Sequence, residues 1–287
     1  MSIPSAVVKY VVPPAGADTT RDAATARSHR RKLRSYQVEQ SFYRAFAARC
    51  DAACRVPAPI HLSTEQGRVL LVLEDLDAAG FGLRRNRVSD AELRACLSWL
   101  AAFHATFLHE APEGLWKVGS YWHLATRPDE LRALADRELQ RAAAGLDERL
   151  NRARFRTLIH GDAKLQNFCF AADASAVAAV DFQYVGGGVG VKDVAYFLSS
   201  CLSSARLEAE AEACLEDYFL LLARALQTRE VPADEIDALI REWRALYPVA
   251  CADFYRFLLG WESGASARDP YLEAVTRAVL RARSKAG

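Results

Sequence analysis

The stretch that decides the fold of this chain reads His160-Gly161-Asp162-Ala163-Lys164-Leu165-Gln166-Asn167, and a second stretch downstream reads Asp181-Phe182-Gln183. The first has the spacing H-x-D-x-x-x-x-N and the second begins with D-F. Together these two patterns are typical of sites that transfer a phosphoryl group to a hydroxyl. No other segment of the sequence is as specific.

The residues between the two stretches predict a β-hairpin. Residues 168–170 and 176–180 are short apolar runs rich in strand formers, and five small or polar residues separate them. Antiparallel pairing places Asn167, before the first strand, beside Asp181, after the second. An amide oxygen and a carboxylate are hard ligands, which suit a Mg²⁺ ion that carries nucleotide phosphates.

The remaining polar residues of the loop are then available for the reaction. We expect Asp162 to accept a proton from the attacking hydroxyl or to orient it. We expect Lys164 to neutralise charge on the phosphoryl group during transfer. Both residues are therefore predicted to be catalytic.

Two other interpretations of these motifs fail on the sequence. A facial iron triad needs a second histidine downstream, but His160 is the last of the six histidines. The glycine run at 186–190 does not fit the dinucleotide pattern G-x-G-x-x-G, because Val191 occupies the third glycine position.

Composition indicates a large globular enzyme without a nucleic-acid or membrane partner. The chain has 287 residues, half of them hydrophobic, which suffices for two packed lobes. Its 37 basic and 36 acidic side chains argue against nucleic-acid binding.

The seven scattered cysteines are an odd count and are typical of reduced thiols. We find no targeting signal and no run near the ~18 apolar residues of a membrane span, so we expect a cytoplasmic location.

The order of the expected elements is a small strand-rich part followed by a large helical part, an α+β arrangement. Ser89-Asp90-Ala91-Glu92 is a capping box that opens a helix, and Asp193 is expected to cap another helix at 194–202. The other expected segments are a strand at 6–12, a polar loop containing Gly16, a basic run at 27–34, a helix at 36–49, strands at 57–63 and 69–74, and helical segments at 127–156 and beyond 194.

The motifs and their order resemble those of the aminoglycoside phosphotransferase and choline kinase superfamily, which has a two-lobed protein-kinase-like fold. Residues 160–167, Asp181-Phe182-Gln183-Tyr184 and Lys192-Asp193 resemble its ecdysteroid-kinase-like (CHK-type) branch most closely. The resemblance implies an N-lobe over residues 1–75 and a helical C-lobe over residues 76–287. It implies an ATP- and Mg²⁺-dependent kinase of a small-molecule hydroxyl.

The resemblance also implies roles for individual residues. Lys9 matches the strand lysine that holds the nucleotide phosphates, and Glu39 matches the helix glutamate that pairs with it. Leu73-Glu74-Asp75-Leu76 matches the hinge whose backbone meets the adenine, which makes Glu74 and Leu76 nucleotide-binding residues. Asp162 matches the base, Asn167 and Asp181 match the metal ligands, and His160 supports the loop.

Several residues also have plain structural interpretations. Lys9 could be an ordinary edge-strand lysine and Glu39 an ordinary helix residue. We expect the basic run 27–34 to be a solvated helix face rather than a phosphate clamp, and His104 to be a hydrogen-bonded core histidine. The glycines at 186–190 could supply loop flexibility or let the backbone approach the acceptor, and the sequence leaves both open.

One feature of the superfamily is missing before the strand lysine. Related kinases place two strands and a glycine-rich loop there, whereas only eight residues precede Lys9 and the first glycine is Gly16. The sequence therefore predicts an N-lobe that lacks its first strands. Either coding sequence upstream of Met1 supplies them, or the protein is a catalytically impaired pseudokinase that serves as a binding module.

The acceptor is expected to bind to the helical C-terminal part. Asp253, Phe254, Tyr255 and Trp261 cluster there, with Phe254 expected in the core and Asp253 and Trp261 in the pocket. Because there is no acidic cluster beyond the catalytic carboxylates, we expect an apolar or mixed hydroxylated acceptor rather than a polycation.

Overall fold

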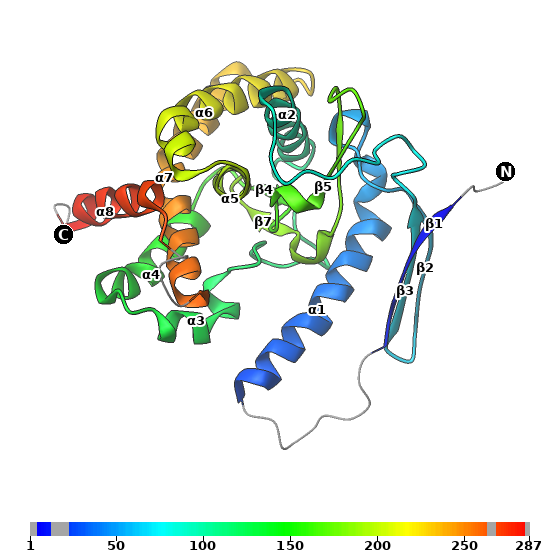
Figure 1. Cartoon of the computed structure of the whole chain (residues 1–287), viewed down its shortest axis with the longest axis horizontal. Coiled ribbons are helices and arrows are strands. Elements are labelled where there is room, and N and C mark those ends of the chain that lie inside the picture. Colours follow the sequence, from blue (N-terminus) through cyan, green and yellow to red (C-terminus); the bar gives the residue numbers. More distant parts are fainter. Residues whose placement is uncertain (1–4, 13–22, 263–267, 285–287) are drawn as a thin grey trace.

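The computed structural model of the chain describes residues 5–12, 23–262 and 268–284. The polar loop expected around Gly16 lies outside the described residues. The described chain has one three-stranded and two two-stranded antiparallel sheets and a mostly helical body, so the expected α+β class is confirmed. Figure 1 shows the larger sheet beside α1, with the helical body on the other side of that helix.

The three-stranded sheet carries the first predicted site residue. Its strands are β1 (Ala6–Val11), β2 (Pro59–Glu65) and β3 (Arg68–Glu74), in the order β1-β3-β2, close to the expected bounds. The central strand β3 alternates between buried and less buried residues, as a sheet with one covered face does. Lys9 lies opposite Leu71 of β3, so its position along the sheet is set by backbone pairing.

Helix α1 (Ala23–Ala45) packs on this sheet and begins well before the expected start at Tyr36. The basic run 27–34 belongs to its N-terminal half. That half lacks an apolar periodicity, but arginine and lysine are good helix formers and continue the helix started by the buried half. The prediction for residues 36–49 was therefore wrong at both ends, since 47–49 form the separate 3₁₀ turn η1 (Ala47–Arg49).

Helix α2 (Asp90–Thr106) forms the centre of the helical body. Ser89 and Glu92 form both hydrogen bonds of the expected capping box, which confirms that prediction. His104 is fully buried on this helix and contacts the Tyr218 hydroxyl at 2.8 Å through Nδ1. The prediction of a hydrogen-bonded core histidine is confirmed.

The helical body contains more breaks than the sequence indicated. The segment expected to be helical at 127–156 forms two helices, because the chain turns at 134–136 and the Asp136 side chain caps the second helix. The further helices and 3₁₀ turns are η2 (Ala52–Cys54), η3 (Leu124–Thr126), α3 (Pro128–Ala133), α4 (Arg137–Asn151), η4 (Leu165–Asn167), η5 (Phe182–Tyr184), α5 (Val191–Cys201), α6 (Ser204–Gln227), α7 (Ala233–Trp261) and α8 (Pro270–Ser284).

Two small sheets frame the catalytic motifs. Strands β5 (Phe168–Phe170) and β6 (Val177–Ala179) form the expected hairpin. Strand β4 (Thr157–Ile159) pairs with β7 (Gly186–Gly188), so most of the glycine run is a strand rather than a loop. A Cβ at Gly186 would collide with the backbone oxygen of Trp116, which explains why glycine is needed there.

A cluster of aromatic rings connects α1 to the segment that follows Asp181. The rings of Phe42 and Phe182 are stacked, with centroids 3.9 Å apart and planes 10° apart. The Phe182 ring also lies 4.8 Å from the imidazole of His160. Both phenylalanines are fully buried, so this contact fixes the helix that carries Glu39 relative to the loop at 160–167.

No helix among the described residues is long and apolar enough to cross a membrane.

We predict that Phe42→Ala lowers the free energy of unfolding by about 3–5 kcal/mol, because it removes a buried ring and leaves a cavity. The measurement is urea unfolding followed by tryptophan fluorescence and circular dichroism. The matched control is Leu220→Ala on α6, where the side chain is 46% exposed and the expected change is within about 0.5 kcal/mol. Equal effects of the two substitutions would contradict this account of the aromatic cluster.

Candidate active site

The loop between β4 and β5 brings three of the predicted residues together, with Lys164 and Asn167 around the carboxylate of Asp162. Asp162 is almost fully buried, and its Oδ2 accepts hydrogen bonds from Lys164 Nζ and Asn167 Nδ2, each at 3.1 Å. Asn167 Nδ2 also donates to the backbone oxygen of Asp162 at 2.7 Å. The structure therefore brings together the two residues predicted to be catalytic and one predicted metal ligand.

The hairpin brings the second predicted metal ligand to the same place. Val180 N donates to the Asn167 carbonyl at 2.9 Å, so Asp181 follows directly after a residue bonded to the loop. Asp181 has a left-handed backbone (φ 69°, ψ 64°), which turns the chain sharply into η5.

The oxygens at this point fit a cation. Oδ1 of Asp162 and Oδ1 of Asp181 are both buried and have no hydrogen-bond partner among the described residues. Buried carboxylate oxygens are normally satisfied, and a divalent cation with hard-oxygen preference would satisfy both. The described residues contain no group of three or more His, Cys, Asp or Glu side chains that could hold a metal. The candidate ligands here are the Asp181 carboxylate and the Asn167 side-chain oxygen, with Asp162 beside them.

Burial raises the pKa of Asp162 above its usual value, and the nearby Asp181 raises it further. The positive charge of Lys164 and its hydrogen bond to Asp162 oppose this shift in the pKa. A carboxylate whose proton affinity is increased in this way is suited to take a proton from a hydroxyl.

The predicted pair of Lys9 and Glu39 forms an ion pair. Lys9 Nζ lies 2.5 Å from Glu39 Oε2, and the Glu39 side chain is only 3% exposed. Burial raises the pKa of Glu39, while the charge of Lys9 opposes the rise and Asp181 adds to it. Glu39 is therefore close enough to Asp181 for the charge of Asp181 to affect its pKa. The Lys9–Glu39 pair and the hairpin residue Asp181 thus belong to one site.

These residues open into one cavity. It has a volume of about 380 Å³, and all four residues predicted to bind the nucleotide line it together with Asp181. The complete lining is Val7, Lys9, Glu39, Tyr43, Pro57, Leu73, Glu74, Asp75, Leu76, Asp77, Arg84, Val180 and Asp181. The cavity lies between the sheet, α1 and the hairpin, where the sequence predicts the nucleotide.

The two predicted hinge residues are held by structural contacts. Both carboxylate oxygens of Glu74 lie 2.5 Å from Arg55 Nη2, and Glu74 Oε2 also accepts from Ala58 N at 2.9 Å. The Leu76 side chain is buried against Cys169, and its carbonyl accepts from Phe81 N at 2.8 Å. These contacts fix the hinge backbone in position beside the cavity.

Asp193 holds the catalytic loop, a role that the sequence did not indicate. Its carboxylate accepts from the backbone N of His160 at 2.6 Å and of Gly161 at 2.9 Å, and contacts His104 Nε2 at 3.2 Å. Asp193 was predicted to cap a helix at 194–202, but α5 begins at Val191 and Asp193 lies inside its first turn. The available signal was the Lys192-Asp193 pair of the resemblance, which carried no predicted role.

His160 and Gly161 shape the loop that Asp193 holds. The His160 ring contacts the Val180 carbonyl through Nε2 at 3.0 Å and accepts from Asp162 N through Nδ1 at 3.2 Å. These partners indicate the neutral Nε2–H tautomer. Gly161 has φ 76°, and a Cβ there would collide with the Tyr184 carbonyl, so only glycine fits.

The structure corrects the expectation that Asp253 lines an acceptor pocket. Asp253 is fully buried, and Oδ1 accepts from Arg256 Nη2 at 2.8 Å and from Nε at 3.0 Å. Trp122 Nε1 donates to its Oδ2 at 3.2 Å, and Lys192 Nζ lies 3.7 Å from the same oxygen. A buried carboxylate needs such partners, and the sequence could not show that they converge there. Phe254 is buried, as predicted.

Trp261 is half-exposed and ends a row of aromatic rings that begins beside η5. The Tyr184 ring lies 4.9 Å from Tyr121, and the Tyr121 ring lies 6.0 Å from Trp261. Trp116 stacks on the other side of Tyr184, with ring centroids 6.1 Å apart. This aromatic row (Trp116, Tyr184, Tyr121 and Trp261) offers flat apolar surface next to the segment that carries Asp181.

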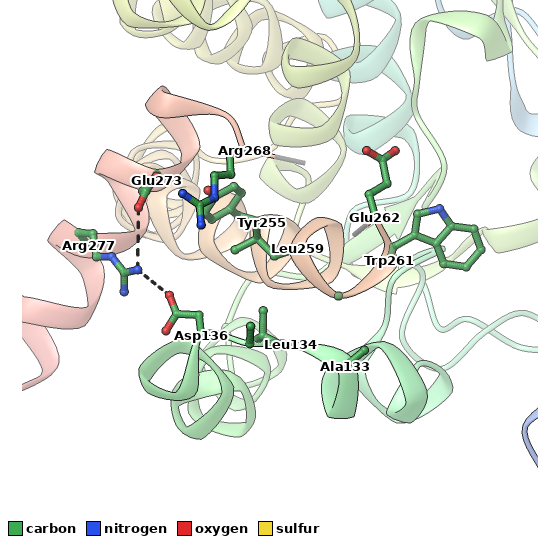
Figure 2. Close-up of a pocket in the computed structure, with 12 residues that line it drawn as sticks. Ala133, Leu134, Asp136, Tyr255, Leu259, Trp261, Glu262, Arg268, Glu273 and Arg277 are labelled. Carbon is green, nitrogen blue, oxygen red and sulfur yellow. Dashed lines mark hydrogen bonds and ion pairs between the residues drawn. The ribbon is translucent and has the colours of Figure 1, made fainter. Parts of the chain in front are cut away.

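A second cavity, of about 830 Å³, borders the far end of this row at Trp261. Figure 2 shows that it lies between α7, α8 and the turn from α3 to α4. One arginine of its lining is paired there, since Arg277 Nη2 lies 2.6 Å from Asp136 and 3.9 Å from Glu273.

Comparison with known proteins gives a family match over most of the chain. Residues 17–246 match the model of the phosphotransferase enzyme family. Among solved structures, the chain is similar to aminoglycoside phosphotransferase APH(3'')-Id from Streptomyces rimosus in complex with ADP and streptomycin, with 15% identity, a TM-score of 0.48, and coverage of 75% of this chain and 83% of that chain. It is also similar to a choline/ethanolamine kinase family protein from Mesorhizobium loti, with 16% identity, a TM-score of 0.44, and coverage of 88% and 79%. No curated protein matches the sequence.

We predict that Asp193→Asn lowers the free energy of unfolding by about 2 kcal/mol, because an amide accepts more weakly from the two buried backbone N–H groups. Urea unfolding measures the loss, and amide hydrogen exchange should accelerate at His160 and Gly161 more than elsewhere. Asp237→Asn, at an exposed position of α7, is the matched control. Unchanged exchange at the two amides would contradict the proposed anchoring.

We predict that Asp162→Asn stabilises the ligand-free protein at pH 7. The folded state raises the pKa of Asp162 above its usual 3.8, so folding favours the protonated acid and wild-type stability falls as pH rises above that value. Asparagine removes this penalty but keeps an oxygen for Lys164. The gain in melting temperature should shrink as pH falls toward 4, and Asp237→Asn should show no such trend. A variant less stable than wild type at pH 7 would refute this.

Proposed function

Because the chain belongs to the phosphotransferase enzyme family, we propose that it is an ATP- and Mg²⁺-dependent kinase that phosphorylates a hydroxyl of a small molecule. One observation carries this proposal. The unpartnered Oδ1 atoms of Asp162 and Asp181 lie in the same site as the Lys9–Glu39 ion pair, beside a cavity lined by the hinge. This combination serves phosphoryl transfer better than a structural role, because unpaired buried carboxylates destabilise a fold.

The nucleotide would occupy the 380 Å³ cavity. We propose that the backbone at Glu74 and Leu76 receives the adenine, with the Arg55 and Phe81 contacts holding that backbone in place. Lys9 would contact the phosphates, and Glu39 would keep the Lys9 ammonium in position through their ion pair. This supports a division into an N-lobe of residues 1–75 and a C-lobe of residues 76–287, with the nucleotide between them.

Asn167 and Asp181 would hold the metal. Mg²⁺, when bound, supplies positive charge that neutralises the nucleotide phosphates. Burial is the main cause that raises the pKa of Glu39 and of Asp162, and the charge of Asp181 adds to it, so a cation held there would offset that repulsion. The side-chain amide of Asn167 already donates to Asp162, so its oxygen is the atom left for a cation.

Asp162 would act on the acceptor. Its carboxylate takes the proton of the hydroxyl as the hydroxyl oxygen bonds to the γ-phosphorus, and ADP leaves with the electron pair of the broken P–O bond. Lys164 Nζ, 3.1 Å from Asp162 Oδ2, would neutralise charge on the phosphoryl oxygens. The aromatic row next to Asp181 gives the acceptor a flat surface.

Two finer properties, the branch of the family and the class of the acceptor, are inferred from residues of the chain. We retain the ecdysteroid-kinase-like branch because residues 160–167, 181–184 and 192–193 carry its pattern. We further propose a hydroxylated small molecule as the partner rather than a nucleic acid, since the charges of the chain nearly balance.

We predict that millimolar ATP with Mg²⁺ raises the melting temperature, since a ligand that binds the native state stabilises it. Asp181→Ala should lose the Mg²⁺-dependent part of this shift. Asp162→Asn should keep the shift but lose turnover by at least about 10²-fold in a metabolite screen for ATP-dependent phosphorylation. The control is Asp237→Asn, which should behave like the wild type in both assays.

Two results would count against this function. If wild type gave no shift with ATP and Mg²⁺, the alternative of a catalytically impaired binding module would replace the kinase. If Asp162→Asn kept full turnover of an acceptor found in the screen, Asp162 would not be the base.

A further inference from the structure

Four arginines of α1 line a pocket. They precede Glu39 on the same helix. The arginine pocket has a volume of about 280 Å³ and is formed by Arg27, Arg30, Arg31, Arg34, Trp116, Ala125 and Thr126. The arginines follow the spacing i, i+3, i+4 and i+7, which places them on one face of a helix. The sequence interpretation of a solvated helix face does not describe this arrangement, because the face meets Trp116 and η3.

The charge of the arginine pocket is mostly uncompensated. Arg27 pairs with Asp129, through Nη2 and Oδ1 at 2.6 Å. Arg31 and Arg34 donate instead to backbone oxygens, at 2.9 Å to Thr126 and 3.0 Å to Leu115. Within the described residues, Arg30, Arg31 and Arg34 have no carboxylate within 4.0 Å, and Arg30 has no hydrogen-bond partner.

This charge stands out against the rest of the molecule. The whole chain has a formal net charge of only +1, yet one small pocket holds three guanidinium groups that have no carboxylate partner in the part of the chain that the structure describes. Like charges three and four residues apart destabilise a helix, each by a few tenths of a kcal/mol. An anionic ligand removes that repulsion, and guanidinium groups bind phosphate and carboxylate through paired hydrogen bonds.

The arginine pocket adjoins the catalytic segment. Trp116 Nε1 donates to the Gln183 carbonyl at 2.8 Å, and the Trp116 ring stacks on Tyr184. Gln183 and Tyr184 belong to η5, directly after Asp181. The guanidinium of Arg34 lies over the Trp116 ring, 5.9 Å from its centroid, so the pocket continues into the aromatic row.

We propose that the arginine pocket binds an anionic group, phosphate or carboxylate, carried by the acceptor of this site. This rests on the proposed kinase function and names its substrate class: a hydroxyl compound with a flat or apolar part and a terminal anion. Arg31 lies eight residues from Glu39 on α1, a helical rise of about 12 Å. The pocket therefore lies about two helical turns along α1 from the Lys9–Glu39 ion pair.

The cavity of Figure 2 lacks the property that makes the arginine pocket selective. Two arginines, Arg268 and Arg277, line it together with the carboxylates of Asp136, Glu262 and Glu273, so it presents both signs of charge to a ligand. Among the described residues that line the arginine pocket, all the charged side chains are arginines, and Arg27 alone has a carboxylate partner, Asp129. Of these two cavities, the arginine pocket is therefore the one whose charge favours an anion.

The test compares two variants with a charge-matched control in the full chain. Arg30→Gln and Arg34→Gln each remove one guanidinium charge, and Arg224→Gln removes one from an exposed position of α6. In a screen that pairs phosphorylated or carboxylated hydroxyl compounds with their neutral parents, the wild type should prefer the anionic members. Each pocket variant should raise KM for the preferred acceptor about tenfold with little change in kcat. Arg224→Gln should change neither.

A second measurement separates this proposal from the kinase function. Inorganic phosphate alone should raise the melting temperature of the wild type and of Arg224→Gln, and less so in the pocket variants, while the shift with ATP and Mg²⁺ stays unchanged in all of them. Phosphate binding without any ATP shift would leave the pocket supported and sink the kinase.

Three results would overturn the proposal. One is equal phosphate shifts in the wild type and the pocket variants. Another is an equal KM increase for anionic and neutral acceptors. The third is arginine-dependent phosphate binding in an enzyme that prefers neutral acceptors, because the anion would then be a free effector rather than part of the substrate.

Discussion

The contact on which the site depends is the buried carboxylate of Asp193 with the backbone N–H groups of His160 and Gly161. A tight turn with a left-handed glycine leaves these two donors without secondary-structure partners, and burial makes them costly unless a strong acceptor is present. Asp193 lies on α5 and also contacts His104 of α2. One side chain thereby ties two helices to the loop that carries Asp162.

The second constraint is the aromatic cluster around Phe182. Its stack on Phe42 places α1 against η5, so that Glu39, one turn before Phe42, lies near Asp181. The apolar contacts offset the cost of burying Glu39 and Asp162 near Asp181, since burial raises the pKa of both acids and the charge of Asp181 raises it further. Such stored repulsion is expected where a fold keeps charged groups ready for a ligand.

Predictions from the sequence were best where the interactions are local. The capping box at Ser89 and the hairpin at 168–179 were confirmed because neighbouring residues determine them. The start of α1 was wrong because its basic half is helical without an apolar periodicity, and the break at 134–136 depends on a cap at Asp136. The predicted site residues lie together around one cavity and one loop, while their roles stay proposals.

By itself, the sequence determined the local arrangement of residues 160–167 and Asp181, because a short loop and a hairpin bring these residues together within about twenty positions of the chain. Only the tertiary structure decided which distant charges meet. It buried Asp253 against Lys192 and Trp122, and it turned Asp193 toward the loop that carries Asp162. It also gathered the α1 arginines around Trp116. These outcomes depend on the packing of segments that are far apart in the sequence, from 33 residues for Asp193 and His160 to 95 residues for Arg31 and Thr126, and neither spacing nor composition encodes that proximity locally.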